Sequence, residues 1–136
     1  MLTLADVRDW LKTMIAAEGF YIGKLDNKVE KSVGVYQRTE NGFPVMALGG
    51  LDSTKYDVKK ISVLIHWNQN ARETEEVSLA FFEKLRQITN IEIGRTHIHY
   101  LMLLTSEPQD VGTDDGGVYE RVVWFDLYYE RNGERV

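Results

Sequence analysis

The chain has 136 residues, and its 16 Lys and Arg against 21 Asp and Glu give a formal net charge of −5 when the histidines are neutral. Its hydrophobic fraction of 43% and charged fraction of 27% are typical of globular proteins and exclude collagen-like, coiled-coil and disordered classes. We expect a single domain over residues 1–136. Cysteine is absent, which excludes disulfides, thiolate metal ligands and cysteine nucleophiles.

Composition also disfavours two classes of partner. The acidic balance, with no basic cluster longer than Lys59-Lys60, argues against direct nucleic-acid binding, which requires many phosphates to be neutralised at once. No apolar run approaches the roughly 20 residues of a membrane span, and residues 1–6 lack the basic region of a signal peptide. We therefore expect a soluble protein with no direct contact to nucleic acid or membrane.

The first forty residues predict a helix followed by a hairpin. Thr3 and Asp6 resemble a capping box, and apolar residues at helical spacing continue to Ile15, so a helix is expected over residues 3–18. Two β-prone runs, residues 20–25 and 33–37, flank the turn-forming segment Asp26-Asn27-Lys28. This pattern predicts a hairpin with a charged tip. Residues 43–48, with Pro44 near the start, are compatible with an edge strand.

The central region predicts a strand and a second helix. Residues 56–67 alternate, with Ile61, Val63, Ile65 and Trp67 on one face. Asn70 can cap the following helix, whose acidic start and basic end suit the helix dipole. The expected buried stripe of this helix is Val77, Ala80, Phe81, Leu85 and Ile88.

Two further strands are predicted beyond this helix. In residues 97–105, alternation predicts two faces. One carries Ile98, Tyr100, Met102 and Leu104, and the other carries Leu101 and Leu103. A polar loop follows Pro108, and residues 118–129 form a long final strand. The whole pattern predicts an α+β fold: a largely antiparallel sheet of four to five strands with two helices packed on one face, plus the protruding hairpin.

The final strand is apolar on both faces. One face carries Tyr119, Val123, Phe125, Leu127 and Tyr129, and the other carries Val118, Val122, Trp124 and Tyr128. Two helices can cover only one face of the sheet, so we expect another molecule to cover the reverse face. The alternative is that Trp124 and Tyr128 lean on the sheet surface, or that the charged hairpin folds over them.

Metal and catalytic motifs are weak. His97 and His99 share a strand face, and His66 is a conceivable third metal ligand, but no acidic residue in the motif orients them. Asp110, Asp114 and Asp115 do not match the spacing of a calcium-binding loop and are better explained as a polar turn. No phosphate-binding loop or nucleophile elbow is present. The sequence therefore nominates no catalytic, cofactor-binding or metal-binding residue, and an enzyme is not expected.

Several segments resemble a known family. These are residues 49–52, 56–68, 73–75, 110–115, 117–121 and 125–131, together with the segment Gly23-Lys24-Leu25-Asp26-Asn27. They are similar to the minor capsid protein family of tailed bacteriophages and prophages of Gram-positive bacteria, whose members look like tail completion or tail terminator proteins. The similarity covers most of the chain and is weakest over residues 90–100.

The resemblance implies a virion structural protein of the head–tail junction, assembled in the host cytoplasm and without a cofactor. It implies a homo-oligomer, with a hexameric ring as the expected form, that contacts the tail tube protein and the head connector protein. We expect interface residues in the hairpin tip (Asp26, Asn27, Lys28), in the acidic loop (Asp114, Asp115) and on the reverse sheet face (Trp124, Tyr128). Two other functions stay open: a small metal-dependent hydrolase using His66, His97 and His99, and a monomeric small-ligand binding module.

Overall fold

A computed structural model of the chain describes residues 1–23, 25–26, 29–39 and 56–131. The edge strand expected over residues 43–48, and Asn27 and Lys28, lie outside these ranges. The described elements are α1 (Leu4–Leu11), β1 (Gly19–Ile22), β2 (Ser32–Gln37), β3 (Tyr56–His66), α2 (Ala71–Arg86), β4 (Thr89–Ile93), β5 (Thr96–Leu103), β6 (Gln109–Thr113) and β7 (Tyr119–Glu130).

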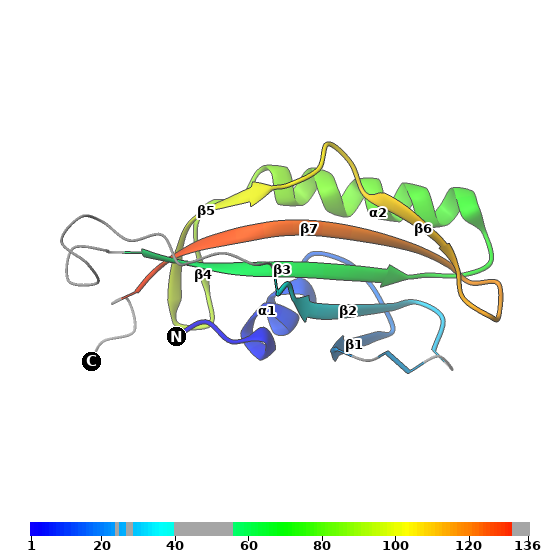
Figure 1. Ribbon diagram of the computed structural model, residues 1–136, viewed down its shortest axis with the longest axis horizontal. Helices are drawn as coiled ribbons and strands as arrows, with labels where there is room; N and C mark the ends of the chain where they lie inside the picture. The colour runs from blue at the N-terminus through cyan, green and yellow to red at the C-terminus, as the bar shows by residue number, and fades with distance from the viewer. Residues whose placement is uncertain (24, 27–28, 40–55, 132–136) are drawn as a thin grey trace.

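The strands form one curved, mixed sheet in the order β1-β2-β3-β7-β5-β4, and β6 also pairs with β7. The long strands β3 and β7 run antiparallel through the centre of the molecule, with Tyr56 opposite Glu130 and His66 opposite Glu120 (Figure 1). The α+β class is confirmed. The prediction of four to five strands was too low, because β4 and β6 are short and carry weak patterns.

The predicted hairpin is wrong. β1 and β2 are neighbours, but they pair in parallel, with Gly19 opposite Ser32 and Ile22 opposite Val35. Parallel strands cannot be joined by the tight turn of a hairpin. Leu25 in this connection is buried and approaches Gly34, where a Cβ would lie 3.0 Å from its Cδ2 atom. Leu25 thus packs against the sheet, and β1 and β2 do not form the protruding hairpin that the turn residues suggested.

Both helices pack on the same face of the sheet, as predicted. A single hydrophobic cluster joins Val7 and Leu11 of α1 and Phe81 and Leu85 of α2 to the inward residues of the central strands. The fully buried strand members are Val33, Val35, Ile61, Val63, Ile65, Val123, Phe125 and Leu127. These residues alternate along their strands, so the opposite face, here called the outer face, carries the residues between them.

The helices differ from the predictions in detail. The capping box of Thr3 and Asp6 is present, but α1 ends at Leu11. Turns continue the apolar spacing beyond it and bury Met14 and Ile15, which explains why the pattern suggested a helix to residue 18. In α2, capped by Asn70, the buried residues are Thr74, Ser78, Phe81, Phe82 and Leu85, whereas Ala80 is exposed.

The alternation in β5 is broken by a bulge. Ile98 lies opposite Tyr129, and Tyr100 lies opposite Tyr128, so His99 is an additional residue in the ladder. Ile98 is therefore buried in the core, while Tyr100, Met102 and Leu104 are exposed. The prediction that these four residues share one face was wrong for Ile98, and Leu101 and Leu103 pack toward the core with it.

Two strands were not predicted. β4 forms a hairpin with β5 through the two-residue connection Gly94-Arg95, in which Gly94 has φ 63°. β6 occupies residues expected to be a polar loop, and it pairs with β7 through a second bulge between Asp110 and Gly112. Glycine is suited to this bulge because Gly112 has φ 91°. The final strand, in contrast, closely follows its predicted range.

Candidate interaction surface

The outer face of the sheet carries a group of exposed apolar and aromatic side chains. Tyr100 is 44% exposed, Met102 43%, Leu104 39% and Trp124 43%. They belong to neighbouring strands, since Met102 lies opposite Asp126 and the Leu104 N–H donates to the Trp124 carbonyl. Tyr56 and Tyr128 adjoin them through ring contacts. We call these six residues the aromatic patch.

Tyr128 lies within the aromatic patch between two other tyrosines. Its ring stacks on Tyr100, with centroids 4.4 Å apart, and meets Tyr56 in a tilted contact at 5.8 Å. Burial raises the pKa of Tyr128, and the nearby Tyr100 and Asp126 groups raise it further. Tyr128 therefore packs against neighbouring side chains of its own sheet. This is what the alternative without a covering partner predicted for it. Trp124 retains a large exposed surface.

A buried ion pair crosses the outer face beside the aromatic patch. Arg38 follows β2, and its Nη2 atom donates to Asp126 Oδ1 at 2.7 Å. Its Nη1 atom donates to the main-chain carbonyls of Ile61 and Phe125. The guanidinium also lies 5.5 Å from the Trp124 ring centroid, a cation–π contact. The positive charge of Arg38 and the negative charge of Asp126 neutralise each other. The ion pair therefore adds no net charge to the aromatic surface beside it.

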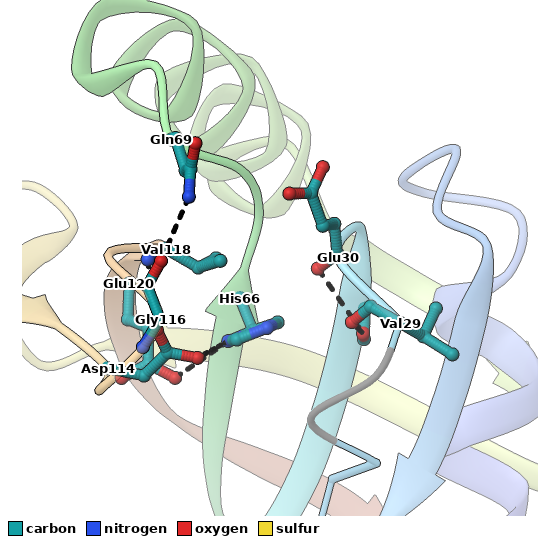
Figure 2. A network of polar contacts seen from close by, with 9 residues as sticks. Val29, Glu30, His66, Gln69, Asp114, Gly116, Val118 and Glu120 are labelled. Atoms are coloured by element: carbon teal, nitrogen blue, oxygen red, sulfur yellow. Dashed lines mark hydrogen bonds and ion pairs between the residues drawn. The ribbon is translucent and has the colours of Figure 1, made fainter.

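At the other end of β7, His66 joins the sheet to the acidic loop, residues 114–118. His66 is fully buried, and its Nδ1 lies 3.0 Å from Glu120 Oε2 and 3.7 Å from Asp114 Oδ2 (Figure 2). An ionised carboxylate only accepts hydrogen bonds, so Nδ1 is the donor. Among the described residues, Nε2 has no hydrogen-bond partner.

The acidic loop is held from several sides. Asp114 Oδ1 accepts the main-chain N–H groups of Gly116 and Val118, each at 2.9 Å. The Gln69 side chain donates to the Gly116 carbonyl at 2.9 Å (Figure 2). Asp114 therefore already accepts hydrogen bonds from its own loop, whereas the Asp115 side chain is exposed and available for an external contact.

The predicted interface residues fall into separate regions. Trp124 and Tyr128 are together in the aromatic patch, and Asp114 and Asp115 lie near Glu120, eight residues from Tyr128 on β7. This spacing corresponds to about 27 Å along an extended strand. Asp26 is exposed in the β1–β2 connection. Arg38 was not predicted to lie on the outer face. The β-prone run ends at residue 37, so no strand pattern assigns residue 38 to either face.

The three histidines do not meet. His66 lies opposite Glu120, while His97 and His99 flank Ile98, which lies opposite Tyr129. Nine residues of β7 separate these positions, or about 30 Å. His97 bonds Glu92 through Nδ1 at 2.7 Å and packs edge-on against His99. Within the described ranges no group of His, Asp and Glu is arranged to hold a metal ion. The hydrolase hypothesis, which needs the three histidines together, is wrong.

An open cavity of about 280 Å³ lies between α1 and β4. Its lining residues are Asp6, Asp9, Trp10, Glu92, Ile93 and Gly94. The carboxylates are engaged elsewhere: Asp6 caps α1, Asp9 pairs with Arg8 and Lys12, and Glu92 bonds His97. Polar groups therefore do not converge on this space as they do in a small-ligand site, and the cavity gives no support to the ligand-binding alternative.

The described residues assemble an aromatic patch, a buried ion pair and an acidic loop held by hydrogen bonds. The family model of the bacteriophage tail terminator proteins matches residues 1–131, and the chain belongs to this family. The predicted resemblance to tail terminators is confirmed, and with it a structural role in the phage tail as a component of the virion. The chain matches no curated protein. None of the described helices is both long and apolar enough to span a membrane.

Proposed function

We propose that this protein terminates the phage tail at the head–tail junction by assembling as a ring, with six subunits as the expected number. The ring would dock on the last layer of the tail tube, block the addition of further tube protein, and offer its opposite rim to the head connector. Membership of the tail terminator family supports the tail role. The ring and its contacts are the proposal.

The observation that carries the proposal is the aromatic patch. Tyrosine, tryptophan, methionine and arginine are the residue types enriched at protein interfaces, and Trp, Tyr and Arg are the commonest hot spots. Tyr100, Met102 and Trp124 remain about two-fifths exposed, with Arg38 beside them. Because Arg38 is already paired with Asp126, covering this region would bury no unpaired charge of this pair.

A second copy of the chain is the proposed cover of the aromatic patch. A closed ring uses heterologous interfaces, in which one patch of each subunit meets a different patch of the next. The exposed acids Asp26 and Asp115, together with Asn27 and Lys28, would then contact the tail tube and the connector. The separation of Asp115 from the aromatic patch supports this division, because one set of residues need not serve both contacts.

Light scattering coupled to size exclusion, over a range of protein and salt concentrations, tests the assembly. We expect the native chain to associate and the Trp124→Ser variant to associate at least about tenfold more weakly, since a central aromatic anchor contributes 2 kcal/mol or more at a hot spot. Leu79→Ser is the matched control, because Leu79 is 40% exposed on α2 and lies outside the aromatic patch.

A native chain that stays monomeric at every concentration would contradict assembly in free solution. Electron microscopy of phage tails made without the protein then tests the termination role directly. A terminator predicts tail tubes of uncontrolled length, and tails of normal length that join heads would overturn the proposal. Complementation with the Trp124→Ser and Leu79→Ser variants would connect the aromatic patch to this result.

A further inference from the structure

One edge of strand β6 has no strand partner in the described part of the chain. The strand pairs with β7 along one side, and no other described strand pairs with it. All five of its residues are exposed, Val111 at 51%, and none belongs to the hydrophobic core. The main-chain groups on its outer side thus have no strand partner among the described residues, which is the condition for a further strand to add.

The two terminal strands of the main sheet, β1 and β4, differ from β6 because a helix lies beside each of them. Helix α1 contacts both β1 and β4, and a neighbouring helix is one way in which proteins shield sheet edges. β6 is fixed in place at its end without being covered, since Asp114 organises the acidic loop and Gln69 and His66 hold that loop. An edge that is ordered and uncovered pays little entropy when it binds a partner strand.

Charge around β6 indicates what kind of strand fits. Residues 105–117 contain Glu107, Asp110, Asp114 and Asp115 and no lysine or arginine. Arg121 lies opposite Asp110 on β7, which leaves an excess of negative charge. A second copy would bring the same acids to the contact, and the bulge between Asp110 and Gly112 also opposes self-pairing, as bulges and charges do at protected edges. A strand that carries lysine or arginine would instead be attracted by these acidic residues.

We propose that the outer edge of β6 is a docking site for an extended, lysine- or arginine-bearing segment of another protein, which binds by adding a strand to the sheet. Main-chain hydrogen bonds would supply affinity, and Asp110 would select positive charge. That the partner is a neighbouring virion protein rests on the proposed function. Recognition of a basic strand rests on β6 alone.

The test uses the full chain, labelled for NMR, and a nine-residue peptide of alternating lysine and threonine. We expect amide shift changes and slowed hydrogen exchange confined to residues 109–113 and the adjoining part of β7. Asp110→Asn keeps an acceptor for the Gly112 N–H, which now bonds Asp110 Oδ1 at 2.9 Å. It should weaken binding about threefold and Asp110→Lys about tenfold, because the selecting charge is lost or reversed.

Two controls make the result specific. Glu75→Lys places the same charge change on the exposed side of α2 and should leave peptide affinity unchanged. A peptide of alternating glutamate and threonine should not bind. The proposal is overturned if the lysine peptide fails to bind, if both peptides bind equally, or if the shift changes lie outside β6 and its neighbour. Tail length is not measured here, so loss of the termination role would leave this result standing, and the reverse also holds.

Discussion

Arg38 and Asp126 meet across an intervening strand. Arg38 follows β2, Asp126 lies on β7, and the guanidinium passes over β3 to make a 2.7 Å bond while also binding carbonyls of β3 and β7. Only about 4% of the Arg38 side chain and 12% of the Asp126 side chain are exposed. The pair joins three strands through side-chain contacts on the outer face, where helices contribute nothing.

Removal of one partner of this pair should be costly. Arg38→Met leaves the Asp126 carboxylate buried without its charge partner, so we expect the free energy of unfolding to fall by about 3–5 kcal/mol. Urea denaturation followed by circular dichroism measures the loss. The double variant Arg38→Met/Asp126→Leu should recover most of it, because no buried charge of the pair remains. A double variant as unstable as Arg38→Met would contradict this explanation.

The donor at His66 Nδ1 should matter more than the imidazole ring itself. His66→Leu brings no donor to Glu120 and leaves its carboxylate without this hydrogen bond, at a cost of about 1–3 kcal/mol. His66→Asn can place an amide N–H near the position of Nδ1 and should lose less. Hydrogen exchange at Gly116 and Val118 reports whether the acidic loop is released; equal effects of both variants would refute a role for the donor.

Two glycines offer a matched pair for testing turn strain. Gly94 has φ 63°, and a Cβ there would lie 3.1 Å from the Asp6 side chain, whereas Gly112 has φ 91° with no atom within 4 Å. Gly94→Ala should lose at least about 1–2 kcal/mol from the left-handed backbone conformation, with a further loss from the contact to α1. Gly112→Ala should lose less than Gly94→Ala, as measured by thermal unfolding. The opposite order would show that the helix contact carries no cost.

Glu73, at the start of α2, should titrate at low pH. A hydrogen bond from Asn68 lowers the pKa of Glu73 from its ordinary value of 4.5, and Lys31, 3.5 Å away, lowers it further. Because the pKa is lowered in the folded state, its stabilising contribution is present above the unfolded value and is lost as the pH falls through the folded value. Carboxyl NMR titration should find Lys31→Met raising the Glu73 pKa, with Lys12→Met as a distant control. An unchanged pKa in Lys31→Met would refute the ion pair.

The elements with strong local patterns were predictable from the sequence. The alternation of residues 56–67 and 118–129 gave β3 and β7 because each has one continuous buried face, and Thr3 and Asn70 marked both helix starts through their capping bonds. The end of α1 was not predictable, since Met14 and Ile15 continue to bury apolar surface in turns after the helix has ended.

The remaining errors arise from long-range pairing. Turn-forming residues such as Asp26 are compatible with a hairpin and with other connections. The parallel pairing of β1 and β2 depends on the tertiary structure, which these local residues do not reveal. Trp124 and Tyr128 were correctly placed on the reverse face, because β7 alternates without interruption. Arg38, Tyr100 and Met102 were not associated with them, since that requires knowing which strands are neighbours and where the ladder of β5 is interrupted.

The bulge at His99 sets which side of β5 faces water. Side chains alternate with a period of two, so a regular ladder in which His99 also took a paired position would reverse every position that follows. Such a ladder would turn Tyr100, Met102 and Leu104 inward with Ile98 and send Leu101 and Leu103 outward, whereas deletion of His99 would leave all of them on their present faces. One bulged residue therefore decides whether these apolar side chains meet water or fill the protein interior.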